Sequence, residues 1–356
     1  MGLALIGTIL ITLILFVYFI VIRRQIRMLN NVKRQEDRER RLQLSKTLQW
    51  IKWAMMASFT GFAIAGVMTL IGTGAERGVF MEHVHGLGYS SDGKRILIPA
   101  HDGIRIYENG IWYVPNKEKH DYMGFSTVDE GFYSSGHPAP GSELKNPLGI
   151  VKSKDEGKTL QTLALEGEID FHNMAVGYSS HVVYVMNQQP NSKMSTAGLF
   201  YSTDEGSTWT KSEMKGITEE LTSMAAHPTE ASVVAIGTPT GVYLSKDHGN
   251  TFEKVALAGQ VTSIFFNNRG DLIIGGYDNQ AYLKRMDVNT KKVEPLSIPN
   301  LTEDSVAYFS QNPVDENQMV FATFRNDIYI SNDRGLNWKK IADQGKTISE
   351  GSPESK

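Results

Sequence analysis

A short motif, Ser-x-Asp-x-Gly-x-Thr/Asn followed by a large apolar residue, occurs four times between residues 153 and 338. The copies contain Ser153, Asp155 and Gly157; Ser202, Asp204, Gly206 and Trp209; Ser245, Asp247 and Gly249; and Ser331, Asp333, Gly335 and Trp338. Their aspartates lie 49, 43 and 86 residues apart, and the last interval is twice the second. A period of about 40–50 residues with strand-like flanks is typical of β-propeller blades. The repeat therefore predicts a ring of similar antiparallel sheets.

Each copy of the motif has the residues of a turn between two strands. A short apolar stretch precedes it, as in residues 241–245, Gly-Val-Tyr-Leu-Ser. Serine and aspartate side chains can bond the amides of their own turn, and glycine accepts a positive φ. Two degenerate copies, near residues 108–112 and 287–291, fit the same period.

Six segments with a common pattern begin near residues 83, 121, 172, 222, 262 and 306, and we assign each to the first strand of a blade. The predicted fold is an all-β, six-bladed β-propeller over residues 83–342, after a linker at 76–82. Residues 343–356 are rich in Ser, Glu and Gly, which predicts a disordered tail. No C-terminal strand is left over to close the ring, although residues 77–82 could add one.

Two uncharged segments, residues 3–22 and 53–75, precede the repeats, and each could cross the ~30 Å membrane core as a helix. Residues 23–46 between them carry nine basic and three acidic side chains, and short basic loops stay in the cytoplasm. We therefore predict a transmembrane hairpin at the plasma membrane, made of helix 1–22, a basic cytoplasmic helical loop at 23–52 and helix 53–75. The N-terminus and the propeller are expected outside. No basic residue precedes the first segment, which favours an uncleaved helix over a signal peptide.

Charge follows the same division of the chain. The formal net charge of −3 combines +6 over residues 1–76 with −9 over the remainder. The acidic outer part argues against nucleic-acid binding. The chain has no cysteine, which excludes disulfides, thiolate metal sites and a cysteine nucleophile. The expected partners are the lipid bilayer and an extracytoplasmic protein or glycan.

The repeated motif resembles the Asp-box, or BNR, repeat, and residues 80–342 resemble the Asp-box β-propellers. That group includes bacterial sialidases, the sortilin ectodomain, photosystem II stability factors and bacterial glycosyl-hydrolase-like proteins. The resemblance implies a propeller fold. It implies little about function, because the box is a structural turn remote from the ligand face in that family.

A sialidase would need a cluster of arginines to bind a carboxylate. Of the seven arginines after residue 76, only Arg325 lies in a loop of the expected ligand face, and the family's Arg-Ile-Pro motif is absent. Glycoside hydrolysis by a pair of carboxylates is a remaining alternative. The loop and strand-start candidates for that role are Asp102, Asp121, Asp170, Asp278 and Asp327.

Histidines gather on one predicted face of the propeller, in blades 1 to 3. That face, formed by the ends that lead into the first strands and by the loops between second and third strands, usually carries the ligand site. The candidate ligand-binding residues there are His83, His85, His101, Asp102, His120, Asp121, His137 and His172. The proline-rich loop at 136–147 interrupts blade 2 on the same face, as a functional loop or a plain insertion.

Alignment of the first strands places His83, Asp121 and His172 in one layer, which could hold a divalent metal ion. The next layer on the same side of the strands contains His85, Met123, Met174, Met224, Ile264 and Tyr308. Its methionines would suit Cu(I), whereas methionine and isoleucine at matching positions of packed blades also form ordinary core.

Three functions are compatible with these observations. The first is a membrane-anchored extracytoplasmic binding module, with a His-rich ligand or metal site on one face of blades 1–3. The second is a glycosyl hydrolase acting on extracellular or cell-surface glycan. The third is an assembly factor for a membrane complex, which rests on analogy of fold alone.

Overall fold

The computed structural model of the chain describes residues 2–28, 39–55, 80–115, 118–256 and 259–348. The chain divides into two compact units, Met1–Thr73 and Gly74–Lys356. The first unit contains helix α1 (Gly2–Met28) and a second helical stretch over residues 39–55. Within these described ranges, no helix combines the length and apolar character that a membrane crossing requires. The predicted transmembrane hairpin therefore has no support from the described helices, and most of its second segment, residues 56–75, lies outside them.

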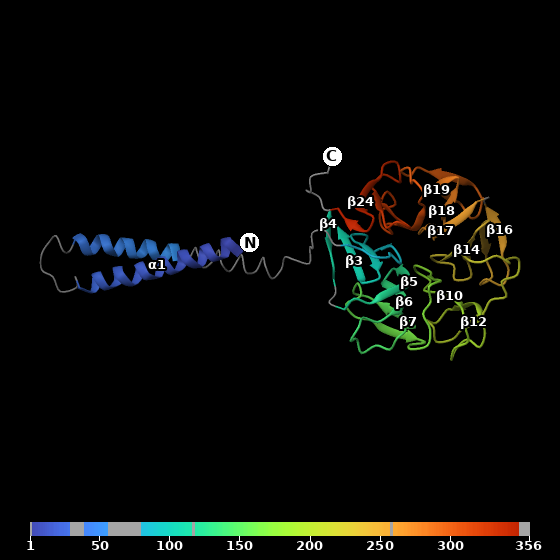
Figure 1. Ribbon diagram of the computed structural model, residues 1–356, viewed down its shortest axis with the longest axis horizontal. Coiled ribbons are helices and arrows are strands. Elements are labelled where there is room, and N and C mark those ends of the chain that lie inside the picture. Colours follow the sequence, from blue (N-terminus) through green and yellow to red (C-terminus); the bar gives the residue numbers. More distant parts are fainter. Residues whose placement is uncertain (1, 29–38, 56–79, 116–117, 257–258, 349–356) are drawn as a thin grey trace. The chain divides into compact units, whose positions relative to one another are not determined.

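The second unit contains the predicted six-bladed, all-β propeller (Figure 1). Each blade is an antiparallel sheet whose strands follow one another in sequence order. Blade 1 is β1 (Gly88–Tyr89), β2 (Ile96–Ala100), β3 (Gly103–Glu108) and β4 (Ile111–Tyr113); blade 2 is β5 (Asp121–Val128), β6 (Gly131–His137), β7 (Ile150–Ser153) and β8 (Gln161–Ala164); blade 3 is β9 (Met174–Val176), β10 (Val183–Asn187), β11 (Gly198–Ser202) and β12 (Thr210–Lys211).

The other three blades continue the pattern around the ring. Blade 4 is β13 (Ser223–Ala226), β14 (Val234–Thr238), β15 (Gly241–Ser245) and β16 (Glu253–Ala256); blade 5 is β17 (Gln260–Phe266), β18 (Leu272–Asp278), β19 (Gln280–Met286) and β20 (Val293–Leu296); blade 6 is β21 (Val306–Gln311), β22 (Met319–Thr323), β23 (Ile328–Ser331), β24 (Lys339–Asp343) and β25 (Lys346–Thr347).

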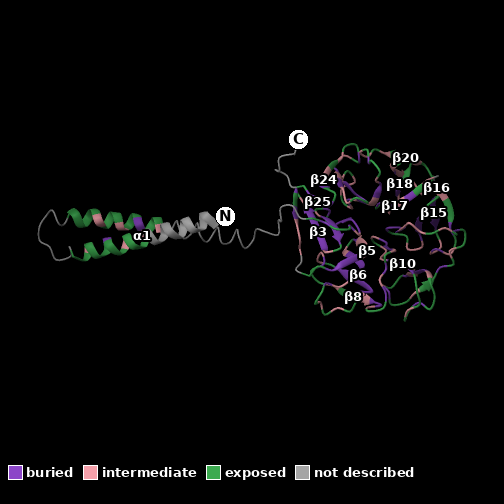
Figure 2. Cartoon of the chain, in the orientation of Figure 1, coloured by how far each residue is buried: buried purple, intermediate pink, exposed green. Residues whose placement is uncertain are grey.

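Apolar side chains pack between each pair of neighbouring blades. Six buried clusters account for the six junctions, including the one that joins blade 6 to blade 1. Buried residues follow the strands of the blades (Figure 2). Because both faces of a blade are covered by its neighbours, strands such as β2, β14, β15 and β22 are buried along their whole length.

The four predicted turns form with a common set of hydrogen bonds. In the second copy, Gly206 N donates to Ser202 Oγ at 2.8 Å, and Thr208 N donates to Asp204 Oδ1 at 2.8 Å. The glycine-to-serine bond measures 2.8, 2.8 and 2.9 Å in the other copies. The residue before each glycine is also left-handed, as at Glu205 with φ 55°, a feature that the motif alone did not predict. These bonds account for the spacing that the four copies share.

The ring closes through both ends of the propeller. Phe80 forms a β-bridge with Lys346, and Met81 N donates to Gly345 O at 2.8 Å. Trp112 Nε1 in β4 donates to Ile348 O at 3.2 Å. Residues 343–348 thus belong to blade 6 and not to the predicted disordered tail. The sequence does not reveal this, because a two-residue strand such as β25 is too short to leave a pattern. The remainder of that tail, 349–356, lies outside the described residues.

Replacement of Ser202 by alanine tests the turn chemistry. The side chain is buried, and its loss leaves Gly206 N without its acceptor. We expect the free energy of unfolding to fall by about 1–3 kcal/mol. Urea denaturation measures it, with Ser207→Ala, an exposed serine of the same turn, as the control. Equal stability of the two variants would show that the serine is dispensable.

Candidate functional site

The inner strands of the blades surround a channel of about 490 Å³. Its described lining is made of small, apolar and uncharged polar residues, and includes no Asp, Glu, Lys or Arg. Three histidines, His83, His85 and His172, also line it. They are the lining residues whose side chains bind metal ions most readily.

Three predicted site residues meet beside this channel. Asp121, the first residue of β5, lies between two histidines of blade 1: His101 Nδ1 is 2.8 Å from Asp121 Oδ2, and His85 Nε2 is 3.5 Å from Asp121 Oδ1. One ligand atom from each of the three residues lies within 4.8 Å of the other two. We call His85, His101 and Asp121 the first cluster.

Backbone pairing within blade 1 places the two histidines. His85 N donates to Pro99 O at 2.9 Å, and His101 N donates to the carbonyls of Glu82 and His83 at 3.1 and 3.2 Å. The segment that carries His83 and His85 is thereby held against the loop between β2 and β3, which carries His101. The three imidazole centroids lie 6.2–6.5 Å apart.

Two buried atoms of the first cluster have no hydrogen-bond partner in the described part of the chain. They are His85 Nε2 and Asp121 Oδ1. The Asp121 side chain is only 10% exposed, so little of it can bond to water instead. A buried polar atom without a partner costs about 1–3 kcal/mol. Burial lowers the pKa of His85, against the raising effect of Asp121, and nearby His101, His83 and His172 lower it further. The neutral imidazole that results can offer a nitrogen lone pair to a cation.

His83 lies next to the first cluster in a strained conformation. Its φ is 48°, in the left-handed region that residues with a Cβ seldom adopt. The His83 ring lies 6.4 Å from the ring of His85 and lines the channel, so it is a near neighbour of any ion that the cluster holds.

The predicted metal set of His83, Asp121 and His172 is not the set that the structure brings together. Asp121 meets His85 and His101, whereas His172 Nδ1 lies 3.3 Å from Asp170 Oδ2. Residues at matching strand positions belong to different blades. The loop of one blade makes closer contacts with the next blade than the aligned strand residues make with one another, as His101 does with Asp121. An alignment of strands cannot predict such contacts.

Two other predicted ligand residues serve the fold instead. The His120 side chain is buried; its Nδ1 accepts from Ala139 N at 3.0 Å, and its Nε2 lies 3.2 Å from Glu118. Burial lowers the His120 pKa, in spite of Glu118. Both carboxylate oxygens of Asp102 accept from Arg105 Nη2 at 2.6 Å. In the sequence, the arginine three residues after Asp102 is a signal that could have indicated this ion pair.

The methionine layer is largely core. Met174 and Ile264 are buried in the clusters between blades 2 and 3 and between blades 4 and 5, and Met224 packs against the cluster between blades 3 and 4. Their contacts favour the packing interpretation over Cu(I) ligation.

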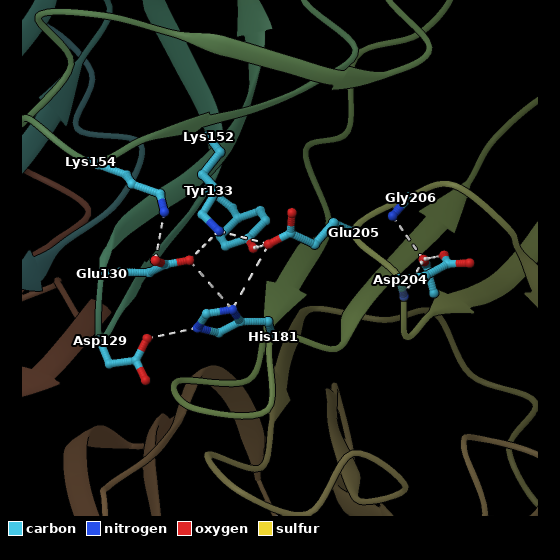
Figure 3. Close-up of polar contacts among 10 residues, drawn as sticks. Asp129, Glu130, Tyr133, Lys152, Lys154, His181, Asp204, Glu205 and Gly206 are labelled. Carbon is cyan, nitrogen blue, oxygen red and sulfur yellow. Dashed lines mark hydrogen bonds and ion pairs between the residues drawn. The ribbon is translucent and has the colours of Figure 1, made fainter.

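A second His/Glu group, which the sequence did not reveal, lies where blade 2 meets blade 3 (Figure 3). Its metal-ligand residues are Glu130, His181 and Glu205. Here the cation is already present: the buried Lys152 ammonium donates to Glu130, and to Glu205 at 2.7 Å. Burial acts to lower the Lys152 pKa, but the two carboxylates raise it overall. This group is an ion-pair network that joins two blades, with Tyr133 also donating to Glu205.

The Lys152 network should make stability depend on pH in the acid range. Hydrogen bonds from Lys152 and Lys154 lower the pKa of Glu130 from 4.5 to about 2. A lowered carboxyl pKa stabilises the fold above pH 4.5, and this contribution is lost as the pH falls towards 2. We expect Lys152→Met to cost about 1–3 kcal/mol at pH 7 and less at pH 2.5.

Urea denaturation at the two pH values measures this difference. Lys154→Met is the matched control, because Lys154 is exposed and pairs with the same glutamate. Its expected cost is below about 1 kcal/mol. A Lys152→Met cost that is the same at both pH values would contradict the assignment.

Comparisons with known proteins bear on the fold alone. No family model and no curated protein matches the chain. Among solved structures, a GH74 enzyme from Niastella koreensis is similar with a TM-score of 0.51 at 14% identity, over 75% of this chain and 46% of that one. The tricorn protease is similar with a TM-score of 0.52 at 14% identity, over 77% of this chain and 27% of that one. YCF48 bound to a D1 peptide has a TM-score of 0.44 at 11% identity, over 76% of this chain and 84% of that one. The chain thus spans less than half the length of the GH74 enzyme and of the tricorn protease, and shares the propeller fold with them.

Proposed function

We propose that the protein is a membrane-anchored, extracytoplasmic binding module whose propeller holds a divalent transition-metal ion in the first cluster. The observation that carries this proposal is the pair of buried, unpartnered atoms, His85 Nε2 and Asp121 Oδ1, 3.5 Å apart beside a histidine-lined channel. A metal ion bound to both would remove the cost of leaving them unpaired.

The donor set suits such an ion. Two imidazole nitrogens and one carboxylate oxygen are ligands that Zn²⁺ and other divalent transition metals accept, and three protein ligands leave a position open. His83 or a ligand in the channel could take that position. A site with an open position binds further molecules, which agrees with a protein or glycan ligand at this face.

Anchoring to the membrane is the part of the proposal that rests on sequence. The uncharged segment 3–22 and the basic stretch 23–46 support an N-terminal hairpin with the propeller outside. The glycosyl-hydrolase alternative has less support, because two of its candidate carboxylates, Asp102 and Asp327, are held by Arg105 and Lys340.

Metal binding by the full-length chain tests the proposal. After removal of metal with a chelator, the protein is dialysed against ZnCl₂ and its zinc is measured. His101→Ala removes one of three ligands, so we expect its first-cluster zinc affinity to fall by at least about 10–100-fold. His248→Asn is the matched control, because it removes a histidine outside the cluster and asparagine tolerates the left-handed backbone there. Equal zinc binding by the wild type and His101→Ala would refute the first-cluster site.

Asp121→Asn separates metal binding from folding. The substitution removes a buried carboxylate charge and keeps an oxygen that can accept from His101. Without metal we expect a free energy of unfolding within about 1 kcal/mol of the wild-type value. Zinc at 100 times its Kd should stabilise the wild type by about 2.7 kcal/mol and the variant by much less. Thermal unfolding with and without ZnCl₂ measures both quantities, and an equal zinc effect on the two proteins would contradict a ligand role for Asp121.

A further inference from the structure

We infer that a second metal ion binds one blade further round the channel mouth, between His137, Asp170 and His172. His137 is the last residue of β6, and the other two lie in the segment that leads into β9. His137 Nε2 and His172 Nδ1 lie 3.4 and 3.3 Å from Asp170 Oδ2. We call these residues the second cluster.

The second cluster repeats the design of the first. In both, an aspartate leads into the first strand of a blade, and a histidine from the preceding blade reaches it. The Asp170 side chain is 11% exposed, and its Oδ1 is buried without a hydrogen-bond partner in the described residues, as is Oδ1 of Asp121. The β5–β6 ladder links the clusters directly, since Asp121 pairs with His137.

The tautomer of His137 identifies the atom that would bind metal. Its Nδ1 lies 2.7 Å from Asn146 Oδ1, which can only accept a hydrogen bond, so Nδ1 carries the proton. Nε2, the other ring nitrogen, faces the Asp170 carboxylate and is the atom that a metal ion at this position would use. Asn146 therefore orients His137 in the way that an outer hydrogen bond orients a metal-bound histidine.

The distances in the second cluster match ligand spacing better than hydrogen bonding. Charge-assisted N–H···O bonds measure about 2.7–2.9 Å. Ligand atoms at about 2.0–2.1 Å from a tetrahedral Zn²⁺ lie about 3.4 Å apart. The two contacts to Asp170 Oδ2, at 3.3 and 3.4 Å, have this second spacing.

Binding at the second cluster requires a small movement. Its three ligand atoms do not yet lie within 4.8 Å of one another, unlike those of the first cluster. His172 is 57% exposed, so its ring can rotate towards an ion held by His137 and Asp170, while Asn146 holds the His137 ring in place. His172 also lines the channel, so this ion would lie at the same mouth as the first.

Zinc stoichiometry of the full-length chain tests the inference independently of the first cluster. We expect about two ions per chain in the wild type, about one in His137→Ala, in Asp170→Asn and in His101→Ala, and almost none in the His101→Ala/His137→Ala double variant. His248→Asn should keep the wild-type value. Asp170→Asn preserves side-chain shape, and circular dichroism confirms that each variant is folded.

The two sites can fail separately in this experiment. If His137→Ala and Asp170→Asn both keep the wild-type zinc content, the second site is refuted and the first is unaffected. If His101→Ala keeps the wild-type content while His137→Ala loses an ion, the first site is refuted and the second is supported. As a further readout, Co²⁺ in place of Zn²⁺ should give a visible absorption band that weakens by about half in each single-site variant and disappears in the double variant.

Discussion

Closure of the ring between blade 6 and blade 1 is the constraint on which the site depends. Met81 is fully buried at this junction, and its amide bonds Gly345 in the last turn of the propeller. Val84 N is held by Asn326 Oδ1 at 3.2 Å. His83 lies between these two contacts, after Glu82, and His85 directly follows Val84. The segment that seals the propeller therefore also presents two imidazoles at the channel mouth, and the strained backbone of His83 lies within it.

The first cluster and the Lys152 network, which both border blade 2, combine carboxylates and histidine with different results. Between blades 2 and 3, carboxylates face the ammonium of Lys152, and the resulting network is complete. Beside the channel, Asp121 faces only imidazoles in the described contacts, and its Oδ1 has no hydrogen-bond partner there. The Lys152 network stabilises the junction between blades 2 and 3. The first cluster leaves a position for a cation, which is why we assign metal binding to the channel mouth.

The fold could be predicted from the sequence because it repeats. Four turns with shared spacing set the blade length, and the degenerate copies near residues 110 and 290 are confirmed as turns between third and fourth strands, with Asn109 left-handed and Asp287 Oδ1 accepting two amides. Ring closure could be predicted only in part: residues 77–82 are an expected addition to the ring, and Phe80 forms a bridge there, whereas the short strand β25 leaves no periodic pattern.

For the first cluster, the residue types could be predicted from the sequence, but their pairing could not. The face and the residue types agree with the first cluster, but alignment of strands placed His83 and His172 with Asp121. Neither of them is its partner. Contacts between a loop of one blade and the first strand of the next depend on loop paths that no repeat encodes. The spacing Asp170-x-His172 is a sequence signal that marks Asp170 as a possible ligand.

Anomalous diffraction from zinc-soaked crystals tests the central claim most directly. The account predicts a peak at the zinc absorption edge in the first cluster, about 2.0–2.2 Å from His85 Nε2, an imidazole nitrogen of His101 and a carboxylate oxygen of Asp121. A map without a peak there, in which His101 Nδ1 remains hydrogen-bonded to Asp121 Oδ2, would contradict it.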